Sequence, residues 1–350
     1  MYSSDKIKKI VHIGASTFIN SDCIQHAREI LEPNSVDLII TDPPYGIKGE
    51  SLHKHYNRDE SFVINGYVEI PADQYSEFSR KWILEAERCL KPGGQIYIVS
   101  GYTNLYDILG GLRSTSLREV NHIIWKYNFG VWTSRKFISS HYHILLYEKP
   151  GARRHFNLQA RYASDEKAQS GGSKNYQDRE DVWVINREYK PGVVKNKNEL
   201  PRALLIKMMQ YSSRPGDLVV DFFMGGCSTA EVAIGMGCKF VGFEISTPIF
   251  ESRVPAINRI AAGALLEGLH TPVPYDLKNQ GKSWSEAEKN RALSLFEQHI
   301  QNGLTKAEAV DRISEVLHRG SWAINKVIAK YAKTRNSRTK SDPRLIPHDF

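Results

Sequence analysis

The feature that most constrains the fold is a regular alternation of short apolar runs with helical patterns along residues 17–149 and 202–244. Strands that alternate with helices form a doubly wound, mostly parallel sheet, and such sheets bind ligands at the carboxyl ends of their strands. We therefore predict an α/β, Rossmann-like fold with its site along that edge. The predicted strands are 17–20, 36–41, 95–100, 120–127, 143–148, 218–222 and 240–244, and the clearest helices are 23–31, 73–90 and 202–211.

The charge balance narrows the class of partner. Lys and Arg outnumber Asp and Glu by 47 to 39, and residues 281–350 hold 13 basic against 8 acidic side chains. Such an excess suits a phosphate backbone, although a basic tail alone favours nucleic acid only weakly.

The cysteines and the hydropathy exclude other classes. Cys23, Cys89, Cys227 and Cys238 show no paired spacing and no His at ligand distance, so we expect neither a metal site nor a disulfide framework. No apolar run reaches membrane-spanning length, and residues 1–9 lack the apolar stretch of a secretory signal. The prediction is a protein of the reducing cytosol with no membrane partner.

One motif directly follows the predicted strand 36–41. Asp42 and the main-chain carbonyl of Pro43 can each accept one hydrogen of an amino group, and the prolines hold that carbonyl rigidly because each fixes φ. Tyr45, after Pro44, can stack on a planar ring. An isolated Asp-Pro-Pro-Tyr is a simple turn about as often as a site.

A second motif is a strand that runs into a small-residue turn and then a helix, over residues 216–229. Glycine lets the backbone approach a ligand closely, and Asp221 can bond the amino-acid end of a cofactor. Glu244 ends the next strand, where a carboxylate suits two ribose hydroxyls. A glycine-rich turn alone is weak support, but the strand-end Glu244 makes a cofactor site the favoured interpretation.

With both motifs in this order, the chain resembles the β-class DNA amino-methyltransferases, over roughly residues 12–150 and 196–262. The resemblance implies a site-specific enzyme that transfers a methyl group from S-adenosylmethionine to N6 of a flipped-out adenine, with Asp42, Pro43, Pro44 and Tyr45 as the catalytic motif. Family motifs also match Ser21-Asp22-Cys23, Leu90-Lys91-Pro92-Gly93-Gly94, Ile123-Ile124-Trp125-Lys126 and Pro201.

The resemblance also assigns the cofactor contacts. It implies that Asp221, Phe223, Gly225 and Glu244 hold S-adenosylmethionine, with Asp22 near its adenine and Pro201 in the segment that covers its methionine end.

The chain departs from the family pattern at several of these positions. The family usually has Asp-Pro-Phe-x-Gly-Ser-Gly-Thr-Thr, where this chain has Phe222, Gly226, Cys227 and Ser228 at the second, sixth, seventh and eighth positions. Cys227 puts a side chain where backbone usually approaches the cofactor, and Leu200 replaces the usual Lys before Pro201.

Four segments follow from this interpretation. Residues 1–150 form the catalytic half of a circularly permuted core, 151–198 a target-recognition insertion, 199–268 the cofactor-binding half and 281–350 a basic helical module. Permutation predicts that the N-terminal strand completes the sheet beside 240–244, with a helix at 248–262.

The predicted DNA contacts lie in two of these segments. In 151–198 basic residues alternate with aromatic ones, which suits phosphate contact and stacking, although for any single residue a solvated loop is the commoner case. The predicted contacts are Arg153, Arg154, Arg161, Lys174, Arg179 and Arg187, with Tyr162, Tyr176 and Trp183.

The C-terminal segment predicts three helices, 284–301, 306–317 and 322–332, the first two capped by Ser285 and Thr305. It resembles a helix-turn-helix or Myb-like module that contacts DNA through Lys326 and Lys330, and a structural or dimer-forming role is about as common for such an outline.

Three alternatives stay open. N4-cytosine methylation uses the same geometry, but in the family it more often has Ser in place of Asp42. A protein-glutamine or RNA methyltransferase is disfavoured, because in those the cofactor motif comes first. A catalytically impaired DNA-binding subunit would be expected to lose Asp42 or the cofactor carboxylates, which are present.

The expected partner is double-stranded DNA in a prokaryotic or phage-type cytoplasm, near the nucleoid. A homodimer and a cognate restriction enzyme remain open.

Overall fold

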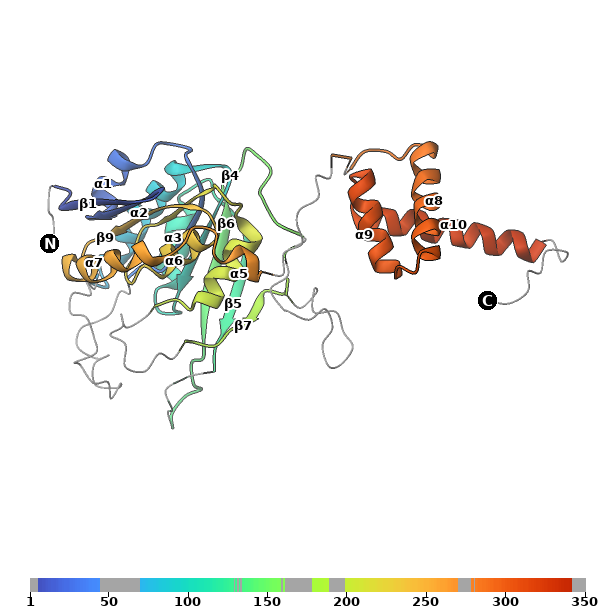
Figure 1. Cartoon of the computed structure of the whole chain (residues 1–350). Coiled ribbons are helices and arrows are strands. Elements are labelled where there is room, and N and C mark those ends of the chain that lie inside the picture. Colours follow the sequence, from blue (N-terminus) through green and yellow to red (C-terminus); the bar gives the residue numbers. More distant parts are fainter. Residues whose placement is uncertain are drawn as a thin grey trace. The chain divides into compact units, whose positions relative to one another are not determined.

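The computed structural model describes residues 6–44, 70–128, 130, 132, 134–158, 160, 178–188, 199–269, 278–279 and 281–341, with side chains as far as 331. The chain divides into two compact units, Met1–Thr271 and Pro272–Phe350 (Figure 1). Among the described helices, none combines the length and the apolar character needed to cross a bilayer.

The first unit is built on a sheet of nine described strands in the order β1-β2-β9-β8-β3-β4-β6-β5-β7. The five strands from β2 to β4 in this order are parallel, whereas β6 runs antiparallel to both β4 and β5. The strands are β1 (Lys9–Ile13), β2 (Ser16–Asn20), β3 (Val36–Thr41), β4 (Leu90–Ser100), β5 (Arg118–Lys126), β6 (His141–Glu148), β7 (Val182–Val184), β8 (Leu218–Asp221) and β9 (Lys239–Glu244).

The N-terminal strand completes the sheet as permutation predicts. β2 pairs in parallel with β9, and Asn20 lies opposite Glu244. The first and last strands of the core are therefore neighbours, which brings the residues that follow β2 next to the end of β9.

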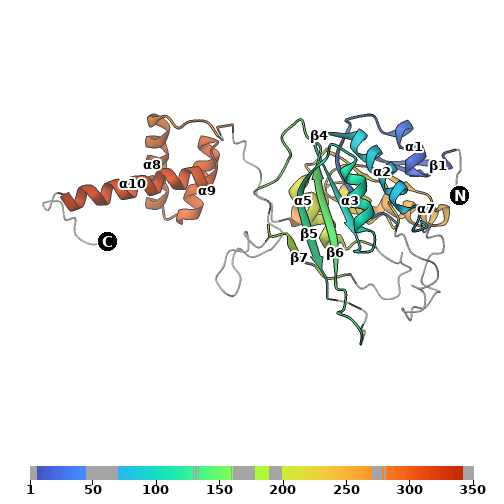
Figure 2. The same cartoon turned by 180° about the vertical axis from the view of Figure 1, so that it is seen from behind.

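Helices cover both faces of the sheet (Figures 1 and 2). Alternate strand residues serve the two faces: Leu38 and Ile40 belong to one core, and Ile39 belongs to the other. Strands buried on both faces need continuous apolar runs, which is the pattern seen in the sequence. One face carries α1 (Cys23–Ile30), α2 (Tyr75–Cys89) and α3 (Leu105–Arg113), and the other carries α5 (Arg202–Ser212), α6 (Ser228–Gly235) and α7 (Thr247–Arg253).

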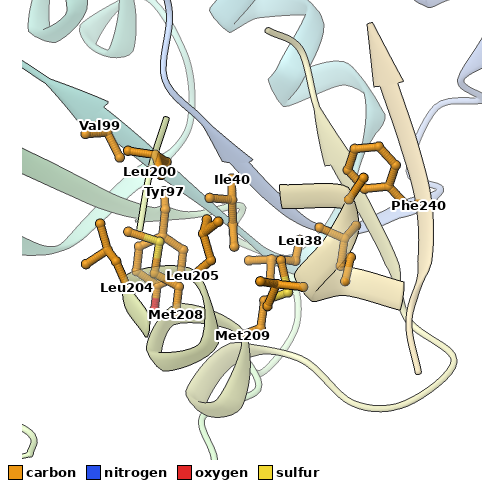
Figure 3. Packing of buried hydrophobic residues seen from close by; sticks show 14 of the residues in the cluster. Leu38, Ile40, Tyr97, Val99, Leu200, Leu204, Leu205, Met208, Met209 and Phe240 are labelled. Atoms are coloured by element: carbon orange, nitrogen blue, oxygen red, sulfur yellow. The ribbon is translucent and has the colours of Figure 1, made fainter. Parts of the chain in front are cut away.

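Helix α5 shows how a helix holds the sheet in place. Leu204, Leu205, Met208 and Met209 are fully buried, and they lie against β3 and β4 (Figure 3). This packing fixes the residues that precede α5 near the carboxyl ends of those strands.

Three features of the unit differ from the sequence prediction. The helix expected at 248–262 ends at Arg253, and a 3-10 helix (Val254–Arg259) follows, because Pro255 cannot donate a backbone hydrogen bond. Helix α3 is absent from the sequence prediction. It packs closely on α2 at Gly111, where an added Cβ would lie 2.7 Å from Ile83 Cδ1. The edge strands β1 and β7 were also not predicted.

The second unit consists of α8 (Glu286–Gln301), α9 (Lys306–Leu317) and α10 (Ser321–Ser341). Ser285 and Thr305 cap the first two helices, each in a reciprocal capping box with the Glu three residues later. The predicted caps are confirmed, and α10 is longer than the predicted 322–332. The small core is formed by Ala292, Val310, Ile313, Leu317, Ile324 and Ile328.

Candidate active site

Four carboxylates follow four adjacent parallel strands. Asp22 comes after β2, Glu244 ends β9, Asp221 ends β8 and Asp42 follows β3. Because parallel strands end at the same edge of a sheet, the topology brings these side chains to one edge, where doubly wound sheets bind ligands.

Asp221 links the two halves of this edge. Its buried Oδ1 accepts hydrogen bonds from the backbone N–H of Phe223 at 3.0 Å and from the Thr41 hydroxyl at 2.8 Å. Burial raises the pKa of Asp221 to about 6, and the hydrogen bonds from Thr229, Phe223 and Thr41 partly oppose this shift. Thr41 directly precedes Asp42, so the hydrogen bond from Thr41 to Asp221 links β3, which leads into the Asp-Pro-Pro-Tyr motif, to β8, which leads into the glycine-rich turn.

Glu244 is held by main-chain donors. Its Oε2 accepts from the N–H of Gly225 at 3.0 Å, and its Oε1 accepts from the N–H of Ser246 at 2.6 Å. Burial raises the pKa of Glu244 to about 7, and the nearby charge of Asp221 adds to the shift. A carboxylate oxygen can accept two hydrogen bonds, so each oxygen retains capacity for a ligand hydroxyl.

Asp22 is the N-cap of α1, where its Oδ1 accepts from the N–H of Ile24 at 2.9 Å. The preceding Ser21 donates its N–H to the Glu244 carbonyl at 3.0 Å, which places Asp22 beside the end of β9. Burial raises the pKa of Asp22 as well.

The glycine-rich turn closes this part of the edge. Gly225 has a φ of +49°, and Cys227, the residue before α6, has a φ of +67°. The Cys227 side chain is 1% exposed and belongs to the apolar core, so the departure from the family's glycine strains the backbone and directs the thiol into packed protein. Phe223 packs edge-on against Trp82, with the ring centroids 5.4 Å apart.

These residues fit S-adenosylmethionine. Asp22, Asp221 and Glu244 are acids whose pKa is raised by burial, and a ligand with positive charge would stabilise their ionised forms. S-adenosylmethionine carries a sulfonium and an ammonium group, and its ribose hydroxyls can donate to Glu244.

Asp42 lies in a separate pocket at the end of β3. Pro43 behind it is buried, Asp42 and Pro44 are half-buried, and Tyr45 lies outside the described residues. The walls of the pocket come from β4, β5, β6 and the segments that lead out of β7 and into α5. The lining residues are Asp42, Val99, Trp125, Tyr142, Arg187, Glu199 and Leu200.

An aromatic group forms one wall of this pocket. Trp125 and Tyr142 are cross-strand partners on β5 and β6, with centroids 5.6 Å apart and planes inclined by 25°. The guanidinium carbon of Arg187 lies 5.9, 4.9 and 5.2 Å from the ring centroids of Trp125, Tyr127 and Tyr142. Among the described residues, the buried Nε of Arg187 has no hydrogen-bond acceptor. The wall therefore combines a packed aromatic cluster, in which Trp125 is 1% exposed, with a cationic donor.

Pro201 is the residue before α5, and the segment in front of it touches the glycine-rich turn. A Cβ on Gly226 would lie 2.3 Å from Oε1 of Glu199, and that carboxylate pairs with Arg253 at 3.1 Å. Since Leu200 lines the Asp42 pocket, this segment borders both parts of the edge.

The structure does not bring every predicted residue to this edge. Arg153 and Arg154 follow β6, which runs antiparallel to β4, so they lie at the opposite edge from the carboxyl ends of the parallel strands. Arg154 pairs with Glu148 at 3.2 Å, and Glu148 lies opposite Gln95 of β4. Trp183 is also not available for stacking, because it is buried and donates to the Glu180 carbonyl at 2.8 Å. These placements argue against DNA contacts by all three.

Other predicted residues lie elsewhere. Arg161, Tyr162, Lys174 and Tyr176 are outside the described residues. Lys326 and Lys330 are exposed on α10 of the second unit.

Sequence reasoning missed several contributors to the edge. The sequence does not single out Thr41 or Tyr142, and it predicts Arg187 as a DNA contact and not as part of the wall of the Asp42 pocket. A signal for Tyr142 was present, because it lies one residue before the predicted strand 143–148, but its pairing with Trp125 needs the register of β5 and β6.

Known proteins resemble this chain in sequence. Residues 36–254 match the DNA methylase family of N6 and N4 methyltransferases. The Type II methyltransferase M.HpaI of Haemophilus parainfluenzae is 31% identical over 231 residues, which cover 63% of this chain and 68% of that protein. M.HinfI of Haemophilus influenzae, also a Type II methyltransferase, is 27% identical over 258 residues, 68% of this chain and 67% of that protein.

The fold is also that of a solved enzyme. The PvuII DNA methyltransferase, which is cytosine-N4-specific, superposes with a TM-score of 0.54 and 15% identity, over 75% of this chain and 94% of that chain. The match to the family covers more than half of the chain. The chain therefore belongs to the DNA methylases that transfer a methyl group from S-adenosylmethionine to DNA, a family with N6-adenine and N4-cytosine types.

Proposed function

We propose that this protein methylates N6 of adenine in double-stranded DNA. The observation that carries the proposal is the carboxylate of Asp42, which lies at the end of β3 in a pocket lined by Trp125 and Tyr142 and borders the acid- and glycine-rich edge. The choice of adenine rests on Asp at position 42, where N4-cytosine enzymes more often carry Ser.

The residues of the pocket would orient the base. The amine of a base is a weak nucleophile because its lone pair is delocalised into the ring. Asp42 accepts one amine hydrogen and the carbonyl of Pro43 accepts the other, so the lone pair points out of the ring plane. Tyr45 stacks on the extruded base, which offsets part of the cost of a few kcal/mol for leaving the duplex.

The other half of the edge would hold the methyl donor, S-adenosylmethionine, whose sulfonium supplies an activated methyl group. Glu244 would accept from the ribose hydroxyls, Asp221 and Gly225 would bind the amino-acid end, and Asp22 would contact the adenine. Phe223 and Pro201 would pack around the cofactor. The support for these roles is the shared edge and the raised pKa values of the three acids.

The remaining assignments are also proposals. Residues 1–150 and 199–268 form the two halves of the core, and 151–198 read the target. The likeness to two Type II methyltransferases supports a companion restriction enzyme. Homodimer formation stays a prediction, which the mass of the protein in solution would test.

N4-cytosine methylation is the second candidate, favoured by the similarity in fold to the cytosine-N4-specific PvuII enzyme. The two are separated by incubating the protein with duplex DNA and S-adenosylmethionine labelled in the methyl group, and then digesting the DNA to nucleosides. We expect label in N6-methyl-2′-deoxyadenosine. Label in N4-methyl-2′-deoxycytidine would replace the first proposal by the second.

A further inference from the structure

The first two turns of α10 present an aromatic side chain to solvent. Trp322 is 70% exposed, and Nζ of Lys326 lies 3.8 Å from the centroid of its ring. Ile324 and Ile328, on the other side of the helix, are buried in the core of the unit. The core of this unit is therefore complete without Trp322.

The start of α10 is rigidly anchored. The turn between α9 and α10 contains His318, with a φ of +51°, and the buried Arg319. The Arg319 guanidinium donates to the carbonyls of Lys282 and Ser283 and to both oxygens of Glu288, at 2.5 to 3.1 Å, and lies 4.5 Å from the centroid of the Trp284 ring. These bonds fix the orientation of Trp322 before any partner binds, so docking would not have to order this turn.

The charge of α10 is of one sign. Between Ser321 and Ser341 the sequence has six basic residues and no Asp or Glu: Lys326, Lys330, Lys333, Arg335, Arg338 and Lys340. The neighbouring acid Glu286 on α8 interacts electrostatically with Lys330 and forms an ion pair with Lys289 at 2.5 Å. Lys326 and Trp322 thus form a cationic, aromatic face that suits a polyanion.

We propose that Trp322 and Lys326 dock the second unit on duplex DNA, as a contact surface distinct from the Asp42 pocket. Lys326 contacts a backbone phosphate, and the exposed ring of Trp322 packs against the sugar and base edges of a groove. A helix that follows another across a short turn can place its N-terminal residues in the major groove, which is where Trp322 and Lys326 lie on α10. The inference rests on the family's DNA substrate and holds whether the methylated base is adenine or cytosine.

The test is DNA binding by the full-length protein, measured by fluorescence anisotropy with a labelled random-sequence duplex at several salt concentrations. Trp322→Ala should weaken binding by roughly fivefold with an unchanged salt slope, because an apolar contact releases no counterions. Lys326→Ala should weaken binding and lower the slope by about 0.9, and Lys326→Arg should restore both. The matched control is Lys306→Ala, which removes the same charge from the exposed first turn of α9 and should leave binding unchanged.

Three results would overturn the proposal. If Trp322→Ala and Lys326→Ala both bound DNA with wild-type affinity, neither side chain would contact DNA. If Lys306→Ala lost as much DNA affinity as Lys326→Ala, the net charge of the unit and not this face would account for binding. A change in solution mass on Trp322→Ala, with unchanged DNA affinity per protomer, would assign this face to a second copy of the chain. Trp322→Phe keeps an aromatic ring and should bind DNA nearly as the wild type does, which guards against a folding defect in Trp322→Ala. Failure of base selection at Asp42 would leave all of these results unaffected.

Discussion

The two parts of the carboxyl edge differ in what holds their functional groups. On the side proposed to hold the cofactor, called the cofactor side below, Asp221 and Glu244 are buried, and backbone N–H groups of Phe223, Gly225 and Ser246 donate to them. On the side proposed to hold the target base, called the base side below, Asp42 is half-buried, and its pocket is walled by side chains such as Trp125, Tyr142 and Arg187 from separate strands and segments. The cofactor side is thus set by local turns, whereas the base side depends on contacts between segments far apart in sequence.

The largest effect is expected at Asp42, where a substitution should abolish methyl transfer without changing cofactor binding. Asp42→Ala removes the acceptor for the amine hydrogen and should lower methyl transfer about a hundredfold or more. Cofactor affinity, measured by calorimetry, should stay near the wild-type value, because Asp42 is not among the carboxylates proposed to hold the cofactor. Near-normal turnover would contradict the assignment.

Glu244 should give the reverse pattern. A lost charge-assisted hydrogen bond costs about 1.5 to 3 kcal/mol, so Glu244→Ala should weaken S-adenosylmethionine binding by roughly tenfold or more. At saturating cofactor the variant should still methylate DNA. An unchanged dissociation constant would remove Glu244 from the cofactor site.

Cofactor binding should depend on pH through the carboxyl group of Glu244. The pKa of Glu244 is about 7, raised by burial, so its carboxylate is lost as the pH falls below that value. Affinity should fall roughly tenfold between about pH 8 and pH 6, and Glu244→Gln should bind weakly with a flatter profile. In the cofactor-free protein the sign is opposite: the folded state holds the extra proton, so stability should rise as the pH falls from 7 towards 4.5, the usual pKa of Glu. Affinity independent of pH in the wild type would contradict the assignment.

A smaller effect on the base side is expected from Arg187. Arg187 lines the Asp42 pocket and packs over its aromatic wall. Arg187→Ala should therefore loosen that wall, lower kcat/KM for DNA by roughly fivefold and leave cofactor affinity intact. Arg154→Ala, at the opposite edge, removes the same charge and should have no such effect. Equal losses in both variants would mean that net charge, and not the pocket, matters.

The smallest effect should come from Cys227. Because its side chain is buried in the apolar core, Cys227→Gly should change the dissociation constant of S-adenosylmethionine by less than about twofold. A larger gain in affinity would show that the thiol obstructs the cofactor after all.

The cofactor side could be predicted from the sequence more completely than the base side. On the cofactor side, the alternation of strands and helices and the circular permutation predict the order of the strands. Asp221 and Glu244 each end a short apolar run, so the sequence alone places them at the ends of strands. The wall of the base pocket could not be predicted, because it depends on the register that pairs Trp125 with Tyr142. Trp183 shows a related limit. The sequence predicts that it contacts DNA, but apolar size does not tell which face of an element is covered, and the structure buries this side chain.

The most direct test of the account is a genome-wide map of modified bases in cells that express the protein, compared with cells that express Asp42→Ala. We predict N6-methyladenine at one recurring short sequence in the first and none above background in the second. N4-methylcytosine at the recurring sequence would contradict the choice of base, and the same modified sites with Asp42→Ala would contradict the role given to the base side of the edge.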